Sequence, residues 1–143
     1  MKKRVLFICE HNSARSQIAA AYLRKYGSED YDVESAGLEP TELNPLAVAV
    51  MKEAGIDISD QKPQSVFDLF RQGKLYQTII TVCQPAADQC PIFPGVAKRL
   101  HWPFDDPAQF TGTWEQNLSK TRQVRDRIEI TVKEWISENR IPG

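Results

Sequence analysis

A short apolar segment that leads directly into a helix begins this sequence. Residues 4–9 (RVLFIC) are almost continuously apolar and partly β-branched or aromatic, which predicts a buried strand. Residues 10–14 form a polar turn, and apolar side chains then recur at helical spacing up to about Tyr26, with Gly27 as a stop signal. The chain therefore starts with a strand and a helix joined by a very short turn.

The rest of the chain continues the alternation of strands and helices. Further strands are predicted at residues 31–35, 78–82 and 100–102, and further helices at 45–54, 65–71 and 115–138. Asn44 and Pro45 suit a helix start, and Gly55 suits its end. Residues 85–113 hold several prolines and are predicted to be rich in loops. This order predicts an α/β fold with a four-stranded, mostly parallel sheet and helices on both faces.

Length and composition fit one globular domain over residues 1–143. Hydrophobic residues make up 41% of the chain, which is enough for a core. The 18 Lys and Arg residues nearly balance the 19 Asp and Glu residues, so no nucleic-acid partner is expected. The longest apolar run has six residues, and the run near the N-terminus has five, so neither a membrane span nor a secretion signal is expected. These features favour a cytoplasmic protein.

The turn after the first strand carries the strongest chemical signal. Cys9 ends the strand, and Arg15 follows after five residues at the start of the helix. Such a turn directs backbone N–H groups and a helix N-terminus toward one point, which suits an oxyanion. Arg15 adds a planar, permanently charged group, and the positive field favours the thiolate of Cys9, a nucleophile aimed at the bound anion. The predicted anion-binding residues are Glu10, His11, Asn12, Ser13, Ala14, Arg15 and Ser16.

Two of these residues have a more specific expected role. Ser16 can donate a hydrogen bond to the thiolate, and Asn12 tolerates a left-handed backbone conformation. The alternative is that Cys9 is an ordinary buried residue and that Arg15 is a solvated helix residue. The strand before the turn and the helix after it favour the functional interpretation.

Cys83 and Cys90 bring the number of cysteines to three. Cys83 follows a predicted buried strand, so in a parallel sheet it emerges at the same edge as Cys9. A helix across residues 83–90 would hold the two α-carbons about 10 Å apart, whereas a disulfide needs them within about 7 Å. If the pair bridges, the segment must bend or unwind, and Pro85 and Pro91 suit a marginal helix. The alternatives are two core cysteines or a zinc site, and the spacing and the two histidines of the chain argue against zinc.

Asp106 stands directly before Pro107 in this loop-rich region. Asp-Pro is a common turn dipeptide, so the residues alone predict a turn or capping role for Asp106.

Together these motifs resemble a known fold family. Cys-x5-Arg-Ser near the N-terminus with a late Asp106-Pro107 resembles the low-molecular-weight tyrosine phosphatases. The segment at residues 81–91, which holds Cys83 and Cys90, resembles one branch of that fold, the thioredoxin-coupled arsenate reductases. Three shorter matches point the same way: Ser35-Ala36-Gly37, Asn44-Pro45 and Asp57-Ile58-Ser59.

The resemblance implies a three-cysteine relay that reduces arsenate to arsenite. In this relay Cys9 attacks arsenate, and Arg15 and the turn hold it. The resemblance also implies that Asp106 is the general acid, with Asp105 as a rival for that role. Cys83 and then Cys90 carry the disulfide outward to reduced thioredoxin, with no bound cofactor and with phosphate as a competing anion. The alternatives are a phosphatase that uses Cys9, Arg15 and Asp106, and a non-catalytic oxyanion-binding or thiol-sensing module.

Some positions depart from the family patterns. Ala108 and Gln109 stand where these phosphatases usually carry tyrosines. Ala20 and Gln64, beside Asn12 and Ser35, match acidic positions that bind potassium in some arsenate reductases, so no metal is expected. Glu10-His11 replaces a common Thr-Gly, and His11 is expected to face solvent rather than to tune the thiolate.

Overall fold

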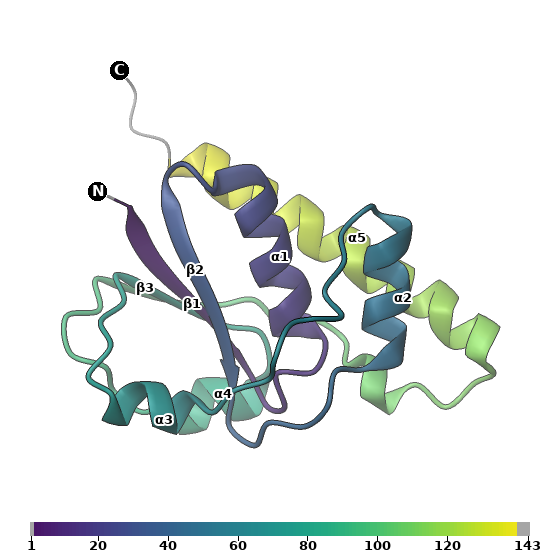
Figure 1. Cartoon of the computed structure of the whole chain (residues 1–143), viewed down its shortest axis with the longest axis horizontal. Helices are drawn as coiled ribbons and strands as arrows, with labels where there is room; N and C mark the ends of the chain where they lie inside the picture. Colours follow the sequence, from purple (N-terminus) through teal and green to yellow (C-terminus); the bar gives the residue numbers. More distant parts are fainter. Residues whose placement is uncertain (1, 140–143) are drawn as a thin grey trace.

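The computed structural model describes residues 2–139 and contains one four-stranded parallel sheet (Figure 1). The strands are β1 (Lys3–Cys9), β2 (Tyr31–Gly37), β3 (Thr78–Thr81) and β4 (Lys98–His101), in the order β2-β1-β3-β4. β1 is central and pairs with β2 from Lys3↔Tyr31 to Cys9↔Gly37 and with β3 from Val5↔Thr78 to Ile8↔Thr81. Residues 5–9 are all buried, as expected for a strand that is covered on both faces.

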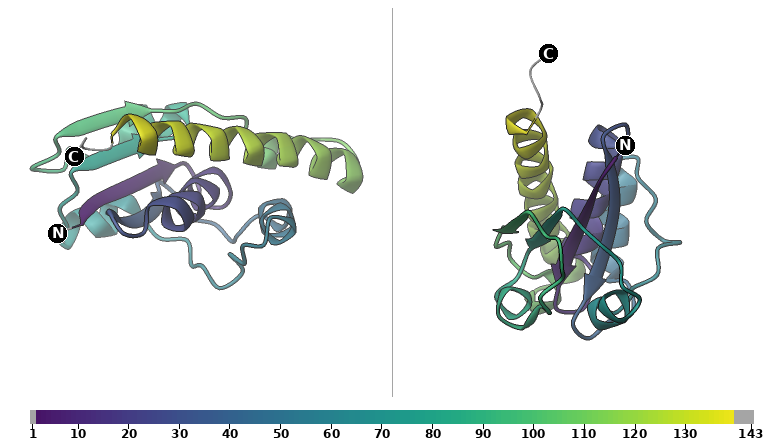
Figure 2. Two further views of the ribbon diagram at one scale, coloured as in Figure 1. Left: turned by 90° about the horizontal axis from the view of Figure 1, so that it is seen from above. Right: turned by 90° about the vertical axis from the view of Figure 1, so that its left-hand side faces the viewer.

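Helices cover the two faces of the sheet (Figure 2). α1 (Arg15–Gly27) and α5 (Trp114–Glu138) lie together on one face, and α2 (Pro45–Glu53) packs against both of them. The short helices α3 (Val66–Arg71) and α4 (Gln84–Gln89) lie on the opposite face, and a 3-10 turn covers Pro107–Gln109. The predicted α/β class and the helices on both faces are confirmed, and all four strands are parallel.

Local sequence signals explain where several helices begin. The side chain of Asn44 accepts a hydrogen bond from the Leu46 N–H at the start of α2, with Pro45 in the first helical position. Thr113 and Gln116 form a reciprocal capping box at the start of α5. α1 differs, because Ala14 precedes it and no side chain caps it. The N-terminal N–H groups of α1 are therefore left without a side-chain acceptor at its cap.

The structure departs from the sequence-based prediction mainly in the proline-rich region. Residues 84–89, predicted to fall largely in a loop, form the short helix α4, in which Pro85 occupies the first turn, where it costs no hydrogen bond. β4 covers Lys98–His101 rather than residues 100–102. Within residues 2–139, no helix is both long and apolar enough to cross a membrane.

Candidate active site

The Cys9–Arg15 turn lies where the chain connectivity of the sheet changes direction. β1 and β3 are neighbours, and the connections from them lead to opposite edges of the sheet. In open α/β sheets such a switch point, at the carboxyl ends of the strands, is the usual position of a ligand site. Cys9 is the last residue of β1, and Cys83 follows β3 by two residues. The two cysteines therefore lie at the same edge, as predicted.

Hydrogen bonds from outside the turn fix the orientation of its peptide groups. The carbonyl oxygens of residues 9–14 all accept hydrogen bonds of 2.8–3.2 Å from donors outside the turn or in α1. In a trans peptide the next N–H points opposite to the carbonyl, so the N–H groups of residues 10–15 face the inside of the turn. The donors are the backbone N–H groups of Leu38, Glu39, Thr41, Asn44 and Ile18 and the side-chain amide of Gln17.

The sulfur of Cys9 sits inside this turn and is hydrogen-bonded there. It accepts a hydrogen bond from the Asn12 N–H at 3.0 Å, and the Ser16 hydroxyl lies 2.9 Å from it. Cys9 is almost completely buried. The N–H donor at this range and the uncapped start of α1 place positive partial charge next to the sulfur. The predicted contact between Ser16 and Cys9 is thus present.

Asn12 supports this arrangement from within the turn. Its φ is +53°, the left-handed conformation that the sequence predicted for it. Its side-chain amide donates to the hydroxyls of Ser16 (2.7 Å) and Ser35 (3.0 Å), and its side-chain oxygen accepts from the Gln64 N–H (3.0 Å). Asn12 therefore ties the turn to the end of β2 and to the segment before α3.

Arg15 points from the start of α1 toward the segment that holds Asp106. Its Nη2 lies 3.2 Å from a carboxylate oxygen of Asp106, and its Nη1 donates to the carbonyl of Phe104 at 3.2 Å. The carboxylate of Asp106 also accepts from the Ala108 N–H, so it caps the 3-10 turn as well. The structure brings Asp106 to the loop arginine, whereas Asp105 is exposed and faces α5.

Cys83 and Cys90 flank α4 as its two caps. Burial raises the pKa of the Cys83 thiol, although the nearby Arg15 charge and N–H donors from Ala86 and Glu10 act to lower it. Burial also raises the pKa of Cys90, against the opposing effect of Arg99. Cys83 is thus close enough to the turn to interact with Arg15 and with the backbone of Glu10. Cys90 is half-buried and lies at the far end of the helix.

Other predicted residues lie at the rim or serve the backbone. A ring nitrogen of His11 is 2.9 Å from the carbonyl oxygen of Glu39, and its other nitrogen is 3.8 Å from the Glu10 carboxylate. These contacts place His11 at the partly exposed rim. The carbonyl groups of Ser13 and Ala14 hold α2 and α1 against the turn.

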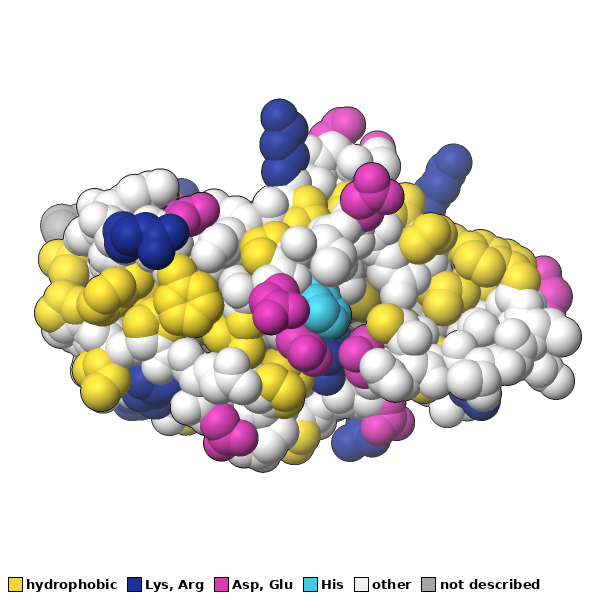
Figure 3. Space-filling view, turned by 90° about the horizontal axis from the view of Figure 1, so that it is seen from below, with side chains coloured by type: hydrophobic (Ala, Val, Ile, Leu, Met, Phe, Trp, Pro, Cys, Tyr) yellow, Lys and Arg dark blue, Asp and Glu magenta, His cyan; other side chains and the backbone are white. Residues whose placement is uncertain are grey.

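Figure 3 shows the face onto which the carboxyl ends of the strands open. Acidic side chains gather around a histidine near its middle, and hydrophobic side chains gather on the side of α3. Phe67 and Phe70, which belong to α3, are exposed hydrophobic residues. No three His, Cys, Asp or Glu side chains within residues 2–139 are grouped so that they could hold a metal ion.

Three supporting residues were not predicted for the site by motif reasoning. Gln17 donates to the Asn12 carbonyl, and Gln64 donates to the Ser35 carbonyl at 2.9 Å. Gly37 lies so close to the turn that a β-carbon there would be 2.7 Å from the Asn12 nitrogen. The Ser35-Ala36-Gly37 match was a signal for this approach, because a glycine at a strand end marks close contact between backbones.

The fold and this site define a phosphatase-like α/β domain with a cysteine in a Cys-x5-Arg turn. The family model for low molecular weight phosphotyrosine protein phosphatase matches residues 4–141. This chain belongs to that family, which confirms the resemblance seen in its motifs.

Several proteins similar to this chain are arsenate reductases. The chain is 43% identical over 135 residues to arsenate reductase of Shouchella clausii (strain KSM-K16), covering 94% of this chain and 95% of the relative. A solved arsenate reductase in the phosphate-binding state matches with a TM-score of 0.80 at 30% identity, over 95% of this chain and 98% of that one. The thioredoxin-dependent arsenate reductase of Corynebacterium glutamicum matches with a TM-score of 0.71 at 30% identity, over 96% of this chain and 60% of that one.

Proposed function

We propose that this protein reduces arsenate to arsenite through a relay of its three cysteines. The observation that carries the proposal is the turn around Cys9, whose amide N–H groups face inward because its carbonyls are bound from outside. That arrangement suits a tetrahedral oxyanion. The arsenate reductases among its relatives support arsenate as the substrate.

The first step joins Cys9 to arsenic. The thiolate attacks the arsenic atom, a sulfur–arsenic bond forms, and one oxygen leaves as water after Asp106 transfers a proton to it. Arsenic remains As(V) in this adduct. Arg15 and the inward N–H groups stabilise the negative charge on the oxygens. The ion pair with Arg15 places the carboxyl group of Asp106 beside the turn, and an anion in the turn would compete with it for Arg15.

The second and third steps move the electrons. The Cys83 thiolate attacks the Cys9 sulfur, the sulfur–arsenic bond breaks, and its electron pair reduces As(V) to the As(III) of arsenite. The Cys90 thiolate then attacks Cys83, which frees Cys9 as a thiolate and leaves a Cys83–Cys90 disulfide. The location of Cys83 beside the turn and of Cys90 one short helix further out supports this order.

A protein dithiol of the thioredoxin type would reduce the final disulfide. The similarity of this chain to the thioredoxin-dependent arsenate reductase of Corynebacterium glutamicum supports this choice. No bound cofactor is needed, because two thiols supply the two electrons. Phosphate, with the same shape and charge as arsenate, is expected to compete for the turn.

The experiment is arsenate-dependent consumption of NADPH with thioredoxin and thioredoxin reductase, with hydrolysis of an aryl phosphate measured in parallel. Cys9→Ser and Cys90→Ser are compared with the unmodified protein. We expect sustained turnover that both variants lose. If NADPH is not consumed while the aryl phosphate is hydrolysed equally well by Cys90→Ser, the protein is a phosphatase and the relay is wrong.

A further inference from the structure

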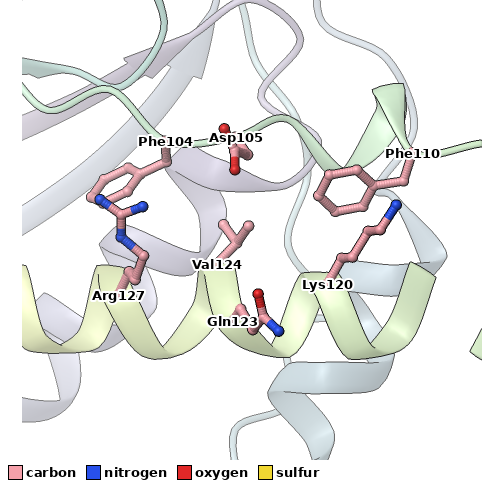
Figure 4. A pocket seen from close by; sticks show the side chains of 7 residues that line it. All are labelled: Phe104, Asp105, Phe110, Lys120, Gln123, Val124 and Arg127. Atoms are coloured by element: carbon pink, nitrogen blue, oxygen red, sulfur yellow. The ribbon is translucent and has the colours of Figure 1, made fainter. Parts of the chain in front are cut away.

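A cavity lies between α5 and the chain segment that carries Asp106. Its volume is about 370 Å³, and one wall is formed by Phe104, Asp105 and Phe110 (Figure 4). The other wall comes from α5, where Lys120 and Arg127 flank Val124. These positions are separated by four and three residues, so they share one face of the helix. Val124 is buried and forms the apolar middle of this wall.

Each end of the cavity pairs an aromatic ring with a cation. The Lys120 ammonium lies 5.6 Å from the centre of the Phe110 ring. Figure 4 shows the Arg127 side chain reaching toward Phe104 at the other end. Both rings are half-buried, and both stand beside the open space. Such surroundings suit a flat ring system, which gains from stacking and from apolar contact.

The two basic side chains of this cavity form no ion pair with a carboxylate among the described residues, unlike the other basic side chains of α5. Arg122 and Arg125 both form ion pairs with Glu53, and Lys133 approaches Glu129. By contrast, neither Lys120 nor Arg127 forms an ion pair with any carboxylate within residues 2–139. Both side chains are exposed, so a favourable interaction with an anion remains available to them.

The third charged group of the cavity is a carboxylate. Asp105 faces the same space from the opposite wall and also has no ion-pair partner among the described residues. A ligand that carries only negative charge would be repelled by it. An N–H or O–H group on the ligand would instead donate a hydrogen bond to this carboxylate.

We propose that this cavity is a binding site for a planar aromatic anion that also carries a hydrogen-bond donor. The ring system lies between Phe104 and Phe110 over Val124, the anionic group meets Lys120 or Arg127, and the donor meets Asp105. The volume lies at the lower end of the range of small-molecule sites, about 300–1,000 Å³. The site is separate from the Cys9 turn, although the Phe104 carbonyl accepts a hydrogen bond from Arg15.

The test uses the full chain and 8-anilinonaphthalene-1-sulfonate, which combines flat rings, one sulfonate and one N–H group. Inorganic phosphate at a saturating concentration keeps the Cys9 turn occupied. Binding is followed by fluorescence and located by amide chemical shifts. The matched neutral probe is N-phenyl-1-naphthylamine, which lacks only the sulfonate. We expect shifts in residues 104–110 and 120–127 and tighter binding of the sulfonate than of the neutral probe.

Variants test the contribution of the two cations. In the double variant Lys120→Gln with Arg127→Gln, the sulfonate should bind about fivefold to tenfold more weakly. The neutral probe should be unaffected. Lys133→Gln is the control, since Lys133 also lies over an aromatic ring, 4.7 Å from the centre of Tyr26, but outside this cavity. The proposal is overturned if the shifts map to the exposed Phe67 and Phe70 on α3, if both probes bind equally, or if the double variant binds like the unmodified protein.

Discussion

The guanidinium of Arg15 forms an ion pair with the carboxylate of Asp106, with 3.2 Å between Nη2 and Oδ2. Both side chains are well shielded, with 9% and 16% of their surface exposed. An anion in the Cys9 turn and the carboxylate of Asp106 therefore compete for the same cation. This relationship separates the two roles proposed for Asp106, because a change there alters anion binding and proton transfer in opposite directions.

Asp106→Asn should lower kcat for arsenate reduction by about 100-fold, since general acid catalysis commonly contributes about 10²–10⁴-fold. The same change should tighten the binding of phosphate, because a negative charge that competes for Arg15 is removed. Steady-state kinetics and calorimetric titration with phosphate measure the two effects. Asp105→Asn is the matched control and should change neither by more than about twofold. If the Asp105 variant loses activity instead, the acid has been assigned to the wrong residue.

Ser16→Ala should slow the reaction of Cys9 with iodoacetamide at neutral pH by a factor of about three to ten. The hydroxyl lies 2.9 Å from the Cys9 sulfur, and its loss removes one of the groups that stabilise the thiolate. The reaction is followed by mass spectrometry of the labelled peptide. Ser119→Ala, at an exposed position on α5, should leave the rate unchanged. Equal rates in both variants would mean that Ser16 is only structural.

Gly37→Ala should disrupt the turn, because its β-carbon would lie 2.7 Å from the Asn12 nitrogen and 2.8 Å from the His11 carbonyl carbon. Backbone atoms cannot move aside cheaply, so we expect a loss of about 1–3 kcal/mol in the free energy of unfolding and a large loss of activity. Urea unfolding measures the stability, and arsenate-dependent NADPH consumption with thioredoxin and thioredoxin reductase measures the activity. Gly55→Ala is the control, since Gly55 has a φ of +80° but open space around it. That variant should lose stability, by about 1 kcal/mol, and keep its activity. An active Gly37→Ala protein would contradict the proposed rigidity of the turn.

The pH dependence of the second step, the attack of Cys83 on the Cys9 sulfur, should follow the ionisation of the Cys83 thiol. Burial raises the pKa of this thiol above its ordinary value, so it is mostly protonated at neutral pH. Only the thiolate attacks, and its fraction grows about tenfold per pH unit below the pKa. Release of arsenite in a single turnover by Cys90→Ser, which stops the relay after this step, should therefore accelerate between about pH 6 and pH 9. A flat profile would show that Cys83 does not limit the step.

Oxidation of Cys83 and Cys90 to a disulfide should unwind α4. The helix has six residues and buries only Ala86 fully, so its own stability is small. Its hydrogen bonds from Ala87 to Cys83 and from Cys90 to Ala86 cannot survive the approach of the two α-carbons. Hydrogen exchange should become faster in residues 84–90 of the oxidised protein. α3 is the internal control, because it also has six residues and holds no cysteine. Unchanged protection in α4 would exclude a bridge within this segment.

The elements that depend on local sequence signals could be predicted well. The continuous apolar run in β1, the Asn44-Pro45 start of α2 and the stripe of α5 each specify their structure through burial or capping. α4 was harder to predict from the sequence, because a six-residue helix in a proline-rich segment has too few residues for a clear periodicity.

The site could be predicted in part. The positions of Cys9 and Arg15 relative to the sheet follow from the motif, because a strand end fixes the first and a helix start fixes the second. The link from Gln64 to Asn12 spans 52 positions, and no local pattern announces it. The pairing of Arg15 with Asp106 and the cavity beside α5 likewise depend on how distant segments pack, which spacing along the chain does not reveal.

The outward-bound carbonyls of the Cys9 turn also bear on selectivity. The preorganised N–H groups of this turn recognise the tetrahedral shape and the charge of an anion. They contact its oxygens and not its central atom. Phosphate and arsenate should then occupy it in proportion to their concentrations. Discrimination would come only after capture: thiols reduce pentavalent arsenic readily but leave phosphorus in the same oxidation state. Selectivity would then arise at the reduction step, because arsenic accepts two electrons from thiols and phosphorus does not. Phosphate would lower the rate of arsenate reduction by competing for the turn, without itself being reduced.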